Sequence, residues 1–224
     1  MLRCALAEWQ LARTRLVRSR LGLWLLLLVG GLVLVARHPV ILALDTGMLA
    51  AVLAVAFTAG ADSDRAALAL TLTHPTTPLA VALGRWLAAN AVAGLCVGIA
   101  CATRAGPGGV EAAALFHAAA GGLAAAAATA ACALAAVWVG GNALAGALFL
   151  YVFVLSHFGP PAIDAVLGNG AVGWIVGAVV SVLPGVWRYA KLAGGDSGAW
   201  AHAAAWAAGG VSVAALVLAR WVRR

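Results

Sequence analysis

Long apolar runs, separated by short basic or Gly/Pro-containing breaks, constrain this chain more than any other feature. The run from Leu21 to Ala36 carries no charge and lies between Arg20 and Arg37. Hydrophobic residues make up 65% of the sequence and charged residues 9%, whereas soluble domains hold about 25% charged residues. A soluble domain of this length could not bury so much apolar surface, but lipid can surround it. The sequence therefore predicts an all-α membrane protein.

Six of the runs are predicted to cross the membrane, because about 20 apolar residues span the hydrocarbon core. The predicted spans are residues 21–36, 40–61, 79–102, 110–137, 143–157 and 199–219. Residues 1–20 place apolar side chains at helical spacing beside arginines, which is typical of a helix lying in the headgroup region. We expect residues 1–224 to form a single transmembrane domain.

The lysines and arginines predict the orientation. With the N-terminus inside, most of them lie on the inner side, at the two chain ends and at positions 65 and 85, and only Arg37, Arg104, Arg188 and Lys191 lie outside. Positive residues favour the cytoplasmic face. We therefore expect a multi-pass protein of a bacterial-type cytoplasmic (inner) membrane, with both termini cytoplasmic. The net charge of +7 has this explanation and does not indicate nucleic-acid binding.

Residues 158–185 are apolar but broken. Gly159-Pro160-Pro161, Gly168-Asn169-Gly170 and Pro184-Gly185 interrupt the run, and each remaining piece is too short to span a membrane. Irregular backbone at membrane depth is tolerated where protein buries it. We therefore expect a re-entrant helical hairpin between the fifth and sixth spans.

Several polar residues fall near the predicted outer surface. They are His38, Asp45, His117, His157 and His202. Neutral imidazole is a common ligand for metals and haem, but histidines also occur at span ends because solvent is near, and none of these has i, i+4 spacing. Asp45 is either a functional charge within a span or a residue that reaches the headgroups or pairs with an arginine. The four cysteines form no CxxC pair and are expected to be packing residues.

Residues 62–74 form the densest charged segment inside the chain. An acidic start, Asp62-Ser63-Asp64-Arg65, leads into an apolar stretch that ends at His74-Pro75. Asp or Ser at a helix start caps free backbone N–H groups. A short cytoplasmic helix is predicted here, between the second and third spans. It is either an ordinary capped loop helix or a lever that passes motion from a soluble partner into the bundle.

This order of parts resembles the membrane-spanning (permease) subunit of type 2 ABC exporters. Members of that family carry an acidic cluster, an apolar helix, Leu-x-x-Pro and then Gly-Lys. The counterparts here are the acidic residues at 62 and 64, Leu72 with Pro75, and Gly84-Arg85. The chain departs from the family at Asp64-Arg65, where many members have Glu-x-x-x-Gly, and at Arg85, which replaces the usual lysine.

The resemblance implies a transport subunit with no catalytic residues of its own. It implies a homodimer, or a dimer with a similar permease, that binds a separate ATP-binding cassette ATPase subunit through the coupling helix. The implied contact residues are Asp62, Ser63, Asp64, Arg65, Leu68, Leu72 and His74. ATP and Mg²⁺ would bind the partner subunit, since this chain has no GxxxxGK[ST] motif. No metal or cofactor is expected on this chain.

Two alternatives remain from the sequence. One is a membrane redox protein that holds haem through the outer histidines, and a haem-export-like permease is a related possibility within the transporter class. The other is an intramembrane hydrolase, for which Gly-x-Ser-Gly, His-Glu-x-x-His and an intramembrane aspartate pair are all missing. The glycine pairs Gly94/Gly98 and Gly173/Gly177 match the close-packing GxxxG motif, which would suit a helix–helix interface.

Overall fold

The computed structural model describes residues 10, 14, 20–59, 77–105, 109–168 and 170–222. Every regular element in these residues is a helix. The elements are α2 (Leu21–Val35), α3 (Pro39–Ala59), α5 (Pro78–Ala102), α6 (Ala112–Phe153), η2 (Leu155–His157), α7 (Pro160–Leu167), α8 (Ala171–Val182), α9 (Val186–Tyr189), η3 (Leu192–Gly194) and α10 (Ser197–Val222). The predicted all-α fold is confirmed for this part of the chain. Of the predicted interfacial helix, residues 1–20, only residues 10, 14 and 20 are described, and the predicted coupling helix lies outside the described residues.

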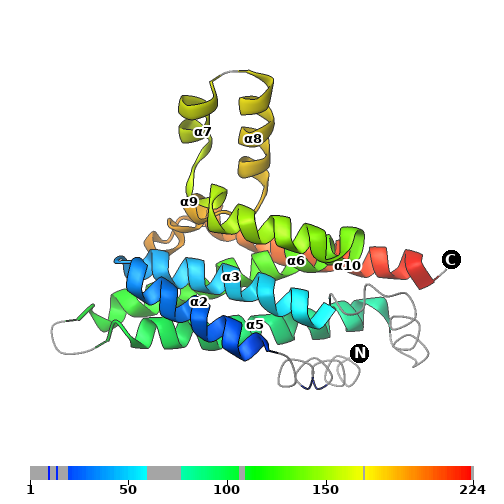
Figure 1. Cartoon of the computed structure of the whole chain (residues 1–224), viewed down its shortest axis with the longest axis horizontal. Coiled ribbons are helices and arrows are strands. Elements are labelled where there is room, and N and C mark those ends of the chain that lie inside the picture. The colour runs from blue at the N-terminus through cyan, green and yellow to red at the C-terminus, as the bar shows by residue number, and fades with distance from the viewer. Residues whose placement is uncertain are drawn as a thin grey trace.

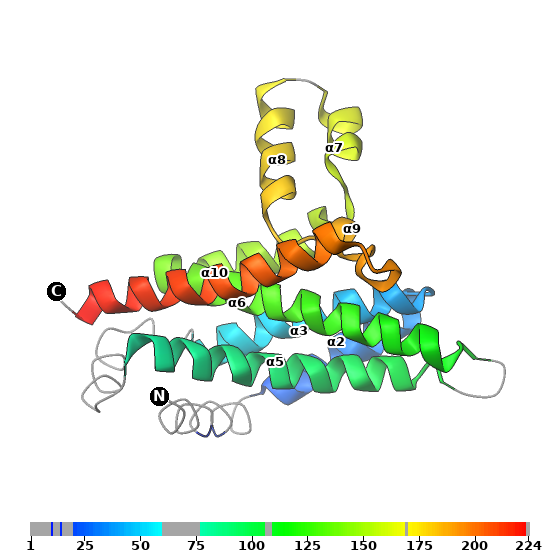
Figure 2. The same ribbon diagram turned by 180° about the vertical axis from the view of Figure 1, so that it is seen from behind.

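The long helices form a bundle with α3 at its centre (Figures 1 and 2). In the most apolar window of α3, 72% of the residues are buried, against 28% for α10. Two glycines bring α3 and α6 together, because a Cβ on Gly47 would lie 2.5 Å from the carbonyl oxygen of Gly122. Small residues at such a crossing let two backbones approach closely.

Four described helices, α3, α5, α6 and α10, are long and apolar enough to cross a membrane, and a bent pair formed by α8 and residues 186–194 would make five. These helices indicate a membrane protein. The first predicted span, residues 21–36, corresponds to α2, which is apolar but only 15 residues long. The number six therefore stays a prediction.

The predicted spans 110–137 and 143–157 fall mostly on one helix, α6, which makes a single candidate span by length and composition. A straight helix of its 42 residues would extend about 63 Å, roughly twice the hydrocarbon thickness. Gly140 and Gly141 leave the helical conformation, and the φ of +66° at Gly141 suits glycine. Figures 1 and 2 show that the ribbon reverses direction there. The gap between the predicted spans 110–137 and 143–157 thus corresponds to a turn at Gly140 and Gly141.

The two ends of the bundle are distinct. In Figure 1, α2 runs away from the end of the bundle at which α10 finishes. At the opposite end, Arg104 donates from Nη2 to the carbonyls of Val33 and Ala36 at 2.8 and 2.6 Å. It therefore satisfies the C-terminal carbonyls of α2 that have no partner within the helix.

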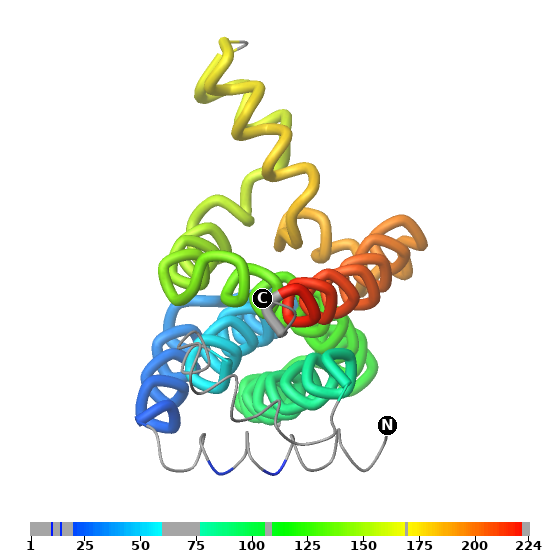
Figure 3. The backbone as a smooth tube through the Cα atoms, turned by 90° about the vertical axis from the view of Figure 1, so that its right-hand side faces the viewer, coloured from blue at the N-terminus to red at the C-terminus, as the bar shows by residue number. Residues whose placement is uncertain are grey.

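The broken segment forms an arm outside the bundle. Helices α7 and α8 agree closely with the two predicted pieces, and Gly168, with a φ of +69°, ends α7. Figure 3, which looks along the bundle, shows both helices projecting away from it. Within the described chain, α7 packs on α8 and neither makes an extensive contact with any other element. The re-entrant path through the membrane stays a prediction.

Candidate functional site

The structure brings two of the predicted outer residues together and leaves the other three apart. His38 and His117 are exposed, before α3 and near the start of α6. Asp45 and His157 form a pair, and His202 lies in a separate network on α10. Both of these polar groups lie at the base of the α7–α8 arm, which is the candidate site.

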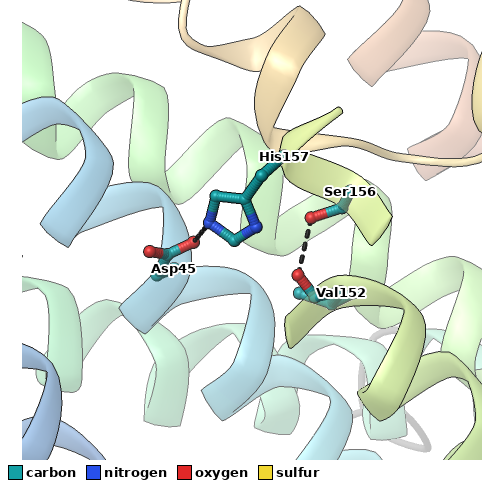
Figure 4. A network of polar contacts seen from close by, with 4 residues as sticks. All are labelled: Asp45, Val152, Ser156 and His157. Atoms are coloured by element: carbon teal, nitrogen blue, oxygen red, sulfur yellow. Dashed lines mark hydrogen bonds and ion pairs between the residues drawn. The ribbon is translucent and has the colours of Figure 1, made fainter. Parts of the chain in front are cut away.

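The first group joins α3 to the start of the arm. Asp45 is buried in α3, and its Oδ1 lies 2.9 Å from Nε2 of His157, the last residue of η2 (Figure 4). The next residue towards the N-terminus, Ser156, donates from Oγ to the Val152 carbonyl at 2.6 Å. This bond fixes the tight turn that follows α6 and so positions the imidazole. The sequence left open whether Asp45 is a functional charge, reaches the headgroups or pairs with an arginine, and in the structure its partner is His157.

The pair favours the charged histidine. The hydrogen bond to Asp45 raises the pKa of His157 above its ordinary value of 6.5. Burial opposes this change, while the negative charge of the carboxylate and a hydrogen bond with the Val154 backbone add to it. With acceptors at both ring nitrogens, an imidazolium can donate to each of them. The site is therefore a histidine–carboxylate pair that is strongest when His157 is protonated.

The second group joins the end of the arm to α10. The Val182 carbonyl accepts from Nε1 of Trp206 at 2.7 Å and lies 3.1 Å from Nε2 of His202. The Nδ1 of His202 lies 3.0 Å from the hydroxyl of Tyr189. Because a carbonyl can only accept, Nε2 carries the proton and Nδ1 accepts from Tyr189. The Nε2 of His202 thus holds the end of α8 to α10, and its Nδ1 holds α9 to the same helix.

The indole ring of Trp187 lies at the base of the arm, between the His157 group and the His202 group, which are called the first and second anchors below. The Nε1 of Trp187 donates to the Val180 carbonyl at 3.3 Å. Glycines lie against the ring, since a Cβ on Gly159 or Gly185 would come within 3.3 or 2.9 Å of it. The segments that begin and end the arm, at Gly159 and Gly185, therefore both pack on the Trp187 ring. The His157 group lies on one side of this ring and the His202 group on the other.

A cleft opens beside the end of the arm, between α6, α8 and α10. Its volume is about 750 Å³. It is lined by Cys132, Ala135, Ala136, Val139, Leu144, Ser181, Val182, His202, Ala205, Trp206, Gly209, Gly210 and Val213. The polar side chains among these have partners within the chain, such as the Gly177 carbonyl for Ser181 Oγ at 2.7 Å. The lining therefore offers apolar contact to whatever enters.

Metal or haem binding gains no support from this arrangement. Among the described residues, no three His, Cys, Asp or Glu side chains are grouped as metal ligands would be. The histidines at 157 and 202 are engaged in separate hydrogen-bonded groups. Cys96, Cys101 and Cys132 are buried free thiols, as expected for packing residues.

One residue at the opposite end of the bundle was not identified as structural from the sequence. Arg85 is fully buried, and its Nη1 donates to the Thr58 carbonyl at 2.6 Å, in the last turn of α3. The neighbouring indole of Trp86 donates to the Ala127 carbonyl of α6 at 2.9 Å. The predicted coupling residues between α3 and α5, Asp62 to His74, lie outside the described residues.

No protein-family model, curated protein or solved structure matches this chain.

Proposed function

We propose that this chain is the membrane-spanning permease subunit of an ATP-binding cassette exporter. The proposal begins with the charged segment 62–74 and the Leu-x-x-Pro and Gly-Arg residues that follow it. Two copies, or one copy and a similar permease, would enclose a pathway across a cytoplasmic membrane. A separate subunit would bind ATP and Mg²⁺ and hydrolyse the nucleotide.

The observation that carries this proposal is the buried bond between Arg85 and Thr58. The helices α3 and α5 flank the proposed coupling segment, and Arg85 attaches the end of α3 to the beginning of α5. A hydrogen bond from a charged donor contributes about 1.5–3 kcal/mol. Force applied by an ATPase subunit to residues 62–74 would therefore move α3 and α5 as one body, which is what a coupling segment needs.

The Asp45–His157 pair extends this connection to the other end of the bundle. Asp45 lies near the start of α3 and Arg85 contacts its end, so both contacts act on one rigid helix. A displacement of α3 would reach η2 and, through it, the base of the α7–α8 arm. In an exporter, this would couple ATP-driven movement on the cytoplasmic side to the outer end of the pathway.

Purification from native membranes in mild detergent tests the function. We expect an ATP-binding subunit to be recovered with the chain in a ratio of about one to one, together with ATPase activity. A chain that is recovered alone, even after crosslinking, would overturn the exporter proposal. A Soret band in that preparation would favour the alternative of a haem-binding redox protein instead.

Substitution of the coupling segment tests the mechanism. Replacing Asp62, Asp64 and Arg65 together with alanine should leave membrane insertion intact and disconnect ATP hydrolysis from transport. Arg37→Ala, at an exposed position at the other end of the bundle, is the control and should leave coupling unchanged. Normal coupling in the triple variant would show that residues 62–74 are an ordinary loop helix.

A further inference from the structure

The outer surface of the α7–α8 arm carries a regular apolar stripe. On α8, the side chains of Val172, Ile175, Val179 and Val182 are 66, 54, 42 and 59% exposed. Their spacing of three, four and three residues places them on one helix face. The opposite face of α8, with Gly173, Gly177 and Val180, is buried. This helix therefore has two apolar faces, and α7 covers only one of them.

The glycine face explains how the arm closes on itself. A Cβ on Gly173 would collide with the carbonyl oxygen of Gly168, and one on Gly177 would lie 3.8 Å from Oδ1 of Asp164 in α7. The Gly173/Gly177 motif is thus used within the hairpin rather than between two chains. A second copy would have to contact the exposed stripe.

Lipid alone is a poor cover for the arm. The arm projects sideways from the bundle (Figures 1 and 3), and its backbone is not helical at Gly168 and Gly170. Irregular backbone at membrane depth needs protein or water around it. Helices of 8 and 12 residues are also too short to be stable without packing. These features favour a protein surface against the arm.

The stripe and the cleft form one continuous surface. Val182 belongs to both, as the last residue of the stripe and as part of the cleft lining. A ridge next to a groove is self-complementary, because a two-fold axis lets each ridge enter the groove of the other copy. Apolar side chains spaced like those of the stripe are the anchors of helix-in-groove recognition.

The exposed area is sufficient for a stable dimer. Besides the stripe, the arm exposes Val166, Leu167 and Trp174 by 78, 44 and 74%. Together with the four residues of the stripe, these make seven side chains that expose about 100 Å² each, or roughly 700 Å² per arm. Two exchanged arms and the grooves that receive them would therefore bury more than the roughly 1,600 Å² of a standard interface. The cleft of about 750 Å³ can accept the side chains of one helix face.

We infer that the α7–α8 arm of one copy packs its Val172–Val182 stripe into the α6/α8/α10 cleft of a second copy, reciprocally. The inference rests on the two-copy assembly of the proposed function and assigns the contact that forms it. The base of the arm, held by the His157 and His202 groups, sets the direction in which the arm reaches its partner.

A photo-crosslinker in the full chain tests this contact directly. With a benzophenone amino acid replacing Ile175, we expect a crosslink to α6 or α10 of a differently tagged copy in native membranes. The matched control is Ile99 on α5, which is 49% exposed against 54% for Ile175, and it should give no such product. Adducts of residue 175 with lipid alone, or with another protein, would overturn the inference.

Self-association provides a second measurement. Ile175→Ser should weaken self-association about one hundred-fold, because each of two copies loses one buried isoleucine. Ile99→Ser should leave it unchanged, and equal effects of the two variants would contradict the inference. If the ATPase subunit is recovered but residue 175 does not crosslink, only the arm contact fails. If the crosslink forms with no ATPase subunit, the exporter function fails and the contact stands.

Discussion

The bundle and the α7–α8 arm have similar apolar, glycine-containing sequences. They differ in whether further helices cover the contacts that their glycines make. In the bundle, Gly47 and Gly122 bring α3 and α6 together, and further helices cover both. In the arm, Gly173 and Gly177 close a two-helix hairpin that has no further helix of its own chain around it. Close packing by glycine therefore completes a core only where enough neighbouring helices are present.

The two regions also differ in where their polar contacts lie. Inside the bundle, buried polar side chains bond to helix carbonyls, as Arg85 does with Thr58 and as Thr129 does with Ala125 at 2.8 Å. In the arm, the polar contacts that reach other elements are at the base, through His157 and Val182. The bundle is thus fixed along its length, while the arm is fixed at one end.

The largest expected effect comes from the glycine crossing of the bundle. A Cβ at Gly122 would lie 2.7 Å from the Ala43 carbonyl oxygen, so Gly122→Leu should lower stability by about 3 kcal/mol or more. Gly22→Leu, on α2, is the control, because a Cβ there meets nothing within 4 Å. Thermal unfolding followed by size-exclusion chromatography in detergent measures both. Equal melting temperatures for the two variants would refute the close crossing.

The next effect should come from the first anchor of the arm. Asp45→Asn should cost about 1–3 kcal/mol, the range for loss of a buried charged hydrogen bond. The hydrogen bond to Asp45 raises the pKa of His157 above 6.5. The contribution is therefore complete below pH 6.5 and is lost as the pH rises through the folded-state pKa. The difference in melting temperature between wild type and Asp45→Asn should accordingly shrink in alkali.

The matched control for this anchor is Asp164→Asn, at an exposed position on α7. It should change the melting temperature little at any pH. A difference between wild type and Asp45→Asn that stays constant from acid to alkali would mean that the ion pair with His157 does not stabilise the fold.

The smallest effect should come from the second anchor. Trp206→Phe removes one donor to the Val182 carbonyl and should cost about 1 kcal/mol, because His202 still contacts that oxygen. Hydrogen exchange should speed up in α8 and not in α3. Trp200→Phe, on the same helix at a position that is 40% exposed, serves as the control. Uniformly faster exchange in both helices would show that the arm and bundle open together.

Features that depend on neighbouring residues were predictable from the sequence. The lengths of the apolar runs indicate membrane helices. The breaks at Gly140-Gly141 and at Gly168 agree with the ends of helical backbone there, because glycine acts on the local conformation. The short helices on both sides of the second break were also located to within a few residues. The coupling residues 62–74 and their role rest on the sequence alone.

Contacts between distant parts of the chain could not be derived in this way. The sequence left three roles open for Asp45, counted Arg85 among the charges of the inner side, and offered the Gly173/Gly177 pair as a helix–helix contact without naming its partner. In the structure, these residues contact His157, Thr58 and the other half of the arm. Each of these contacts depends on how two helices approach one another. The spacing of residues along one helix carries no information about that approach.

The sequence by itself determined that this protein is made of apolar helices and where these helices break. It did so because hydrophobicity and backbone freedom act within a few residues. Only the tertiary structure decided which polar groups meet, that a buried arginine joins α3 to α5, and that an apolar stripe remains exposed beside a cleft. Those outcomes depend on the packing of whole helices, where a close approach at Gly47 and Gly122 fixes the surrounding contacts.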